Sequence, residues 1–133
     1  MNDQITKIAE ACLKGAETDT MTFPSVIQTL MSAGIESYSI DFRRSAATYY
    51  LPDGVSFQLQ THHVDVPVAA TLDTSRLKAA ISEAQQQVEG YTYTGFCKKA
   101  ASAGCAFYSV SFSGRRALYV GRDSATHVEL FPN

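Results

Sequence analysis

Residues 23–53 read F-P-S-V-I-Q-T-L-M-S-A-G-I-E-S-Y-S-I-D-F-R-R-S-A-A-T-Y-Y-L-P-D, and they align without gaps to residues 93–123 at a constant offset of 70. The later stretch reads Y-T-G-F-C-K-K-A-A-S-A-G-C-A-F-Y-S-V-S-F-S-G-R-R-A-L-Y-V-G-R-D, and nine of the 31 aligned positions are identical. Average composition would give about two identities. The identical pairs are Ser32 with Ser102, Ala33 with Ala103, Gly34 with Gly104, Tyr38 with Tyr108, Ser39 with Ser109, Phe42 with Phe112, Ala47 with Ala117, Tyr49 with Tyr119, and Asp53 with Asp123. This pattern predicts an internal duplication. The alternative is that two unrelated helix-strand-strand units share a glycine stop and a tyrosine-rich strand by chance.

The first copy carries the signals of one helix followed by three strands. Thr22 can cap a helix with Pro24 in its first turn, and Gly34 can supply a left-handed stop, which predicts a helix over roughly residues 24–33. Apolar and polar residues then alternate with the period of two that is typical of half-buried strands. The predicted strands cover residues 38–42, 47–51 and 55–60, with turns at Arg44-Ser45 and at Pro52-Asp53-Gly54.

The second copy predicts the same elements. We expect Thr94 to cap its helix and Gly104 to end it. On the last strand Val128 and Leu130 share one face, so Glu129 between them is expected to face water. The predicted strands cover residues 106–112, 116–122 and 126–131, and a further amphipathic helix precedes each copy, near residues 5–13 and 77–88.

The sequence therefore predicts an α+β fold with pseudo-two-fold symmetry, in which a helix-helix-three-strand unit occurs twice and helices cover antiparallel sheet. We expect one domain over residues 1–133, made of repeats at about 3–61 and 73–131 that are joined by residues 62–72. The two sheets could join edge to edge or pack face to face, and the sequence leaves both arrangements open.

Composition limits the class of protein. With 45% hydrophobic residues, 18% charged residues and a net charge of -2, the chain is typical of a globular domain, and its charge argues against a nucleic-acid partner. The stretch Val66 to Leu72 is the longest uncharged apolar run, far short of the roughly 20 residues of a membrane span. Three cysteines fit no disulfide framework, and the N-terminus lacks a signal peptide pattern. We therefore expect no membrane span and a cytoplasmic location.

A resemblance to a known family rests on short motifs. Gly34 to Gly54, read as G-I-E-S-Y-S-I-D-F-R-R-S-A-A-T-Y-Y-L-P-D-G, and the C-terminal H-V-E-L-F-P at residues 127–132 resemble a bacterial and prophage family of proteins of about this length. Its members often carry the label phage envelope protein and have no established function. The resemblance implies a domain that spans the whole chain, and it assigns no catalytic residues.

Histidines and carboxylates form the first candidate site. His62, His63 and Asp65 lie in the joint between the copies, and His127 and Glu129 lie on the last strand. If the copies pack closely, these groups could converge as metal ligands or proton carriers. No spacing among them matches a metal motif, so we expect no metal and no cofactor, and solvated side chains are the alternative.

Arginines form the second candidate site. Arg43 and Arg44 lie at the first hairpin turn, and Arg115 and Arg116 lie at the corresponding turn of the second copy. Such pairs can bind a carboxylate or phosphate through bidentate hydrogen bonds. Charged residues at turns also keep strand edges soluble, which is the alternative interpretation.

Two functional hypotheses follow, and the sequence leaves open whether the protein is an enzyme. The first is a non-catalytic interaction or accessory protein that forms a homodimer through a sheet edge or a tyrosine-bearing face. The second is a small-molecule-binding protein or enzyme with a polar site at the seam between the copies. Cys97 and Cys105 align with apolar positions and are expected to be buried and inert.

Overall fold

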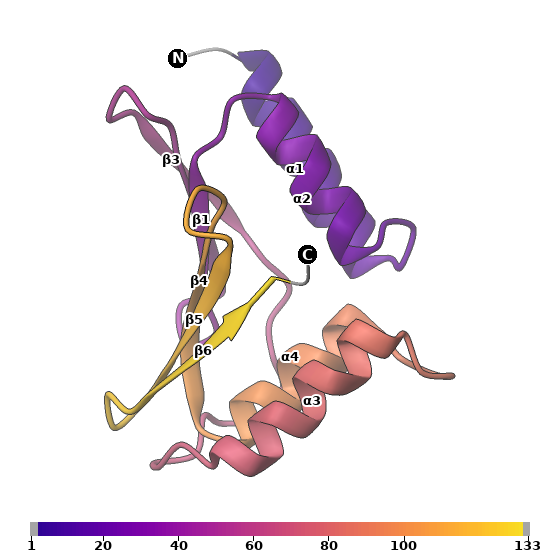
Figure 1. The fold of residues 1–133 in the computed structure, drawn as a ribbon, viewed down its shortest axis with the longest axis vertical. Helices are drawn as coiled ribbons and strands as arrows, with labels where there is room; N and C mark the ends of the chain where they lie inside the picture. Colours follow the sequence, from indigo (N-terminus) through magenta and orange to yellow (C-terminus); the bar gives the residue numbers. More distant parts are fainter. Residues whose placement is uncertain (1–2, 132–133) are drawn as a thin grey trace.

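The computed structural model describes residues 3–131 and contains four helices and one six-stranded antiparallel sheet (Figure 1). This confirms the predicted α+β fold. The elements are α1 (Asp3–Glu17), α2 (Phe23–Ser32), β1 (Ser37–Asp41), β2 (Ala46–Tyr50), β3 (Ser56–Gln60), α3 (Thr74–Gln86), α4 (Tyr93–Ser102), β4 (Cys105–Ser111), β5 (Arg116–Gly121) and β6 (Thr126–Leu130). No helix in this part of the chain is long and apolar enough to cross a membrane.

The two three-stranded meanders join edge to edge through β1 and β4, which settles the arrangement that the sequence left open. The strand order is β3-β2-β1-β4-β5-β6. Ser39 on β1 pairs with Ser109 on β4, which is its equivalent at the offset of 70. On one side of this pair Tyr38 pairs with Val110, and on the other side their equivalents, Tyr108 and Ile40, pair with each other. Such an exchange of partners around one central pair is the register that a two-fold axis produces.

Both helical hairpins cover the same face of the sheet, while the opposite face is open to solvent (Figure 1). Inward-facing residues such as Ile40, Ala47, Val110 and Ala117 are buried. Residues between them on the same strands, such as Ser39, are more exposed. The domain therefore has two layers, with a single hydrophobic core between the helices and the inner face of the sheet.

Helix caps confirm one prediction and correct another. The hydroxyl oxygen of Thr22 accepts a hydrogen bond from the Ser25 amide and caps α2, with Pro24 in the first turn as expected. In the second half the cap is Thr92, which accepts from the Gly95 amide at 3.0 Å, so the prediction of Thr94 was wrong. The offset of 70 itself maps Thr22 onto Thr92, and this symmetry is the signal that identifies the correct cap.

The halves also match in backbone conformation. Gly34 and Gly104 both have positive φ, at 91° and 93°, immediately after the C-cap residues of α2 and α4. Ser45 and Arg115 both adopt positive φ in the β1–β2 and β4–β5 turns, at 52° and 53°. The two halves therefore share the helix end that precedes the first strand of each meander and the turn that follows that strand.

Candidate functional site

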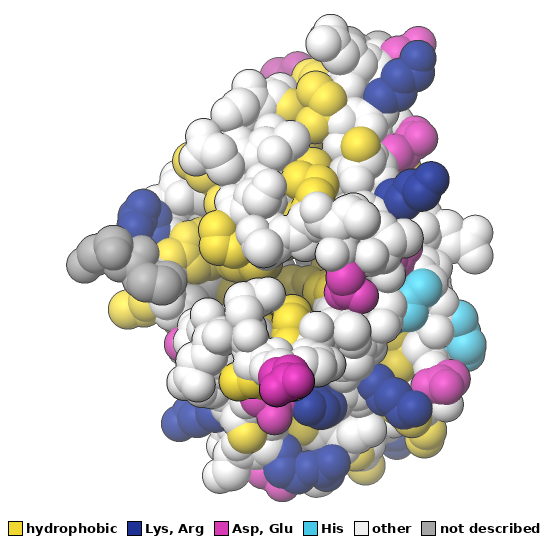
Figure 2. Space-filling view, turned by 90° about the vertical axis from the view of Figure 1, so that its right-hand side faces the viewer, with side chains coloured by type: hydrophobic (Ala, Val, Ile, Leu, Met, Phe, Trp, Pro, Cys, Tyr) yellow, Lys and Arg dark blue, Asp and Glu magenta, His cyan; other side chains and the backbone are white. Residues whose placement is uncertain are grey.

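A cavity of about 550 Å³ lies between the two helical hairpins and the inner face of the sheet. Figure 2 shows the hollow from the helix side, with hydrophobic side chains inside it. All four helices and five of the six strands contribute residues to its wall. Its volume is within the range of roughly 300–1,000 Å³ that is usual for small-molecule sites.

Six of the seven tyrosines line this cavity. On the sheet, Tyr38 stacks on Tyr49 with ring centroids 5.7 Å apart, and Tyr108 lies 5.3 Å from Tyr119 in the other half. Across the β1–β4 junction, Tyr38 and Tyr108 contact edge to face at 6.5 Å. The cavity tyrosines are Tyr38, Tyr49, Tyr91, Tyr93, Tyr108 and Tyr119. The face of the sheet that carries these six tyrosines thus lies under the helices.

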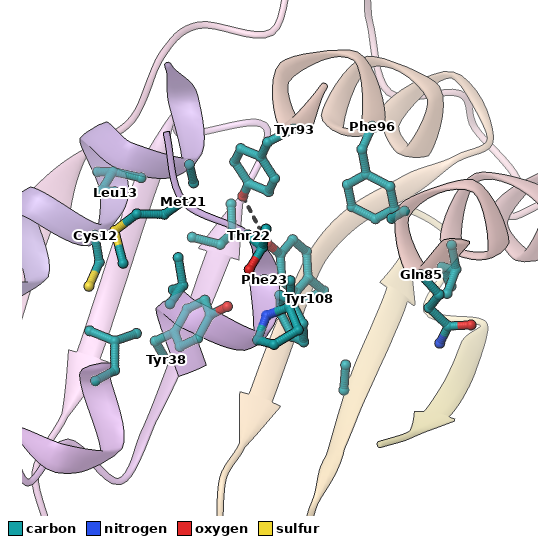
Figure 3. Close-up of a pocket in the computed structure, with 18 of the residues that line it drawn as sticks. Cys12, Leu13, Met21, Thr22, Phe23, Tyr38, Gln85, Tyr93, Phe96 and Tyr108 are labelled. Carbon is teal, nitrogen blue, oxygen red and sulfur yellow. Dashed lines mark hydrogen bonds between the residues drawn. The ribbon is translucent and has the colours of Figure 1, made fainter. Parts of the chain in front are cut away.

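One tyrosine pair crosses from a helix to the sheet. The Tyr93 hydroxyl on α4 lies 2.8 Å from the Tyr108 hydroxyl on β4, as the dashed line in Figure 3 shows. Burial raises the pKa of both groups well above the usual tyrosine range. Both rings therefore carry neutral hydroxyls at neutral pH, and these can donate or accept a hydrogen bond beside a ligand.

Raising the pH above about 9 is expected to destabilise the protein progressively. Burial raises the pKa of Cys97 and Cys105 from 9.0 to about 12 and raises that of Tyr108 above 10.0. Between the unfolded and folded pKa values, the unfolded state has released protons that the folded state keeps, so the free energy of unfolding falls as pH rises.

Urea unfolding at intervals between about pH 8 and pH 11 measures this effect, and absorbance at 295 nm reports tyrosine ionisation in the folded and unfolded protein. A free energy of unfolding that stays constant across this interval would contradict the buried, protonated state of these side chains.

The three cysteines are free and buried, which confirms the prediction for Cys97 and Cys105. Cys12 also lies on the cavity wall, and burial raises its pKa. Because the thiolate is the reactive form of cysteine, a raised pKa makes these thiols poor nucleophiles at neutral pH.

Two carboxylates border the cavity. Glu129 on β6 accepts a hydrogen bond from the Gln85 amide at 3.3 Å, and its other oxygen lies 3.0 Å from His127 Nε2. Asp19, in the loop between α1 and α2, accepts a hydrogen bond from the Tyr93 amide at 3.3 Å. No lysine, arginine or histidine belongs to the described wall.

The orientation of β6 corrects the expectation for Glu129. The side chains of His127 and Glu129 are 14% and 32% exposed and face the helices, whereas Val128 and Leu130 are 44% and 61% exposed. Residues that pair across an antiparallel ladder share a face, and His127 pairs with the inward-facing Tyr119. The pairing of β6 with β5 therefore decides which side chains of β6 face inward, although the outward-facing Val128 and Leu130 are more hydrophobic.

The structure does not bring His62 and His63 together with His127 and Glu129 on β6. His62 follows β3 at one edge of the sheet and β6 forms the other edge. His62 Nδ1 lies 2.7 Å from Glu17, and Asp65 forms an exposed ion pair with Lys98 at 3.5 Å. His63 is exposed. Within residues 3–131, no group of three or more His, Cys, Asp or Glu side chains could hold a metal ion.

The arginine pairs lie at opposite ends of the sheet. Because β1 and β4 are antiparallel, the turn with Arg43 and Arg44 and the turn with Arg115 and Arg116 point in opposite directions. All four side chains are exposed, and the structure therefore does not bring the two pairs together around one anion.

Sequence reasoning missed Asp19 and Gln85 as members of the site. Gln85 lies in a run of three glutamines at residues 85–87 that carries no apolar signal, and Asp19 belongs to a loop without a periodic pattern. The position of Asp19 at the end of an amphipathic helix and just before Thr22 was the one available signal that it lies near the cap of α2.

Comparison with known proteins identifies one family. A family model described as protein of unknown function (DUF1398) matches residues 12–129. None of the curated proteins gives a significant match to the chain. Because the matched segment includes nearly every helix and strand, the chain belongs to the DUF1398 family of proteins of unknown function.

Proposed function

We propose that the protein binds a small, largely apolar molecule in the cavity between its two helical hairpins. The observation that carries this proposal is a space of about 550 Å³ inside a domain of 133 residues. Protein interiors are close-packed, and voids larger than a water molecule are few. A space of this size, walled by aromatic and aliphatic side chains with a few polar groups, has the composition of a ligand site.

Binding is favoured over catalysis by the chemistry of the wall. The Cys12 thiol has a raised pKa, and the Tyr93 and Tyr108 hydroxyls bond to each other and stay protonated. None of these groups is activated as a nucleophile or poised as a base at neutral pH. The hydroxyls are suited to orient a bound molecule.

A tryptophan placed in the cavity is expected to block the site. Ala84 is half-buried on α3 and lines the cavity, so Ala84→Trp would fill part of the space that a ligand occupies. We expect the affinity for Nile red, a neutral dye whose fluorescence rises in apolar surroundings, to fall about tenfold or more, equivalent to about 1.4 kcal/mol.

Ala79→Trp is the matched control, because Ala79 is exposed on the same helix and does not belong to the cavity wall. Circular dichroism would establish that both variants are folded. Equal dye affinity for the two variants, or no saturable binding to the unaltered protein, would rule out the cavity as a binding site.

Self-association is a second candidate role, in line with the interaction hypothesis. Val128 and Leu130 project from the edge strand β6 on the open face of the sheet, and Phe107 is exposed on the same face of β4. An edge strand with apolar outward residues is suited to pairing with another chain. Sedimentation velocity tests this role, and a strictly monomeric protein at high concentration would contradict a homodimer.

We also propose that residues 1–133 are a fused pair of one unit that shares a single core. The identical spacing of α2 with α4 and of β3 with β6 supports a duplication. A destabilising substitution in one half that unfolds both halves would support the shared core.

The free thiols support a location in the cytoplasm, and an association with prophages stays a prediction.

A further inference from the structure

The charged side chains of the described cavity wall are all acidic. Asp19 and Glu129 contribute carboxylates, and the described wall contains no basic side chain to offset them. A fatty acid, a phosphate ester or another anion would therefore meet unfavourable electrostatic interactions on entry. A neutral or cationic molecule would not.

The carboxylate of Glu129 is held at the cavity wall by contacts to both of its oxygens. Gln85 donates an amide hydrogen to one oxygen, and the second oxygen lies 3.0 Å from His127 Nε2. These contacts fix the carboxylate on the inner face of β6. A carboxylate fixed in this way on a regular strand is preorganised to pair with a cation.

The carboxylates also contribute to the raised pKa values of two tyrosines that line the cavity. Burial raises the pKa of Tyr91 to about 12, with smaller contributions from Cys97 and from Asp19. Burial likewise raises the pKa of Tyr119, with Cys105 and then Glu129 adding to the effect. The negative potential of both carboxylates thus extends to the tyrosine rings that line the cavity.

We propose that the ligand is a lipophilic cation, such as an aromatic amine or a quaternary ammonium compound, bound in the cavity with its charge beside Glu129. This inference rests on the proposed binding function and names the chemical class of the ligand. Apolar wall residues such as Phe96 and Ile81 would cover its hydrocarbon part, and Glu129 on the same wall would pair with its charged end.

Three naphthalenes of similar shape test the sign of the charge. They carry a trimethylammonium, a tert-butyl or a sulfonate group at position 2, and their affinities are measured by equilibrium dialysis at neutral pH. We expect the cation to bind about tenfold more tightly than the neutral compound, as about 1.4 kcal/mol of charge pairing would give. The anion should bind least.

Glu129→Gln is expected to remove most of the preference for the cation and to leave the affinity of the neutral compound unchanged. Glu10→Gln is the matched control, because Glu10 is exposed on α1 outside the cavity wall and its replacement alters the net charge equally. A preference that survives Glu129→Gln, or that Glu10→Gln reduces equally, would overturn the assignment of the charged end to Glu129.

The outcomes separate this inference from the proposed function. If Ala84→Trp weakens the binding of Nile red while the three naphthalenes bind equally, the cavity is a binding site but the cation preference is wrong. If neither Nile red nor any naphthalene binds the unaltered protein, the proposed function and the cation preference both fail.

Discussion

Gly104→Ala is expected to destabilise the protein by about 2–5 kcal/mol, far more than the same change at its counterpart Gly34. Both glycines have positive φ, which costs an L-residue about 1–2 kcal/mol. Only at Gly104 would the added methyl group also collide with backbone, namely the carbonyl of Thr71 and the Cα of Leu72. Nothing lies within 4 Å of a methyl group built on Gly34.

The collision has a structural cause in the joint between the halves. The Asp73 amide donates to the Ala103 carbonyl at 2.7 Å, and the Arg122 amide donates to the Gly104 carbonyl at 3.0 Å. These bonds hold the joint and the β5–β6 turn tightly around Gly104. Urea denaturation of both variants measures the difference, and equal losses for Gly34→Ala and Gly104→Ala would show that the joint does not pack there.

Val110→Asp is expected to unfold most of the protein, at a cost of more than about 4 kcal/mol. Val110 is 0% exposed at the centre of β4, between Tyr38 on β1 and Ala117 on β5. A carboxylate at this position would be desolvated with no cation beside it. Typical domains have a total stability of only about 5–15 kcal/mol.

Ser109→Asp is the matched control, because Ser109 is the preceding residue of the same strand and lies on the open face opposite Ser39. We expect it to cost less than about 1 kcal/mol. Hydrogen exchange resolved along the chain would report both halves. Protection that persists in β1, β2 and β3 of Val110→Asp would contradict a single shared core.

Local patterns were sufficient to predict most of the elements. Alternation and turn residues predicted each meander within about one residue, because hairpin contacts are short in sequence. The β1–β4 junction could not be predicted in the same way, because an edge strand presents the same unpaired backbone groups whichever partner it finds. The choice between edge-to-edge and face-to-face packing depends on contacts between residues far apart in the chain.

The candidate site was predicted only in part, for physical reasons that differ from residue to residue. Glu129 was identified as a candidate but assigned to solvent, because hydrophobicity along β6 was weighed without its pairing to β5. His62 was grouped with His127, yet the strand order places them at opposite edges. The cavity itself depends on how two helical hairpins sit over one sheet, which no local pattern encodes.

The β1–β4 junction also has a kinetic consequence. Each meander can close its own hairpins with contacts between near neighbours in sequence, which is fast. Pairing of Tyr38 with Val110 must instead bring the two halves of the chain together, and the loop-closure entropy is lost before any core packing compensates for it. Docking of the two meanders should therefore be the slow step of folding, and the ligand cavity would form only when that step is complete.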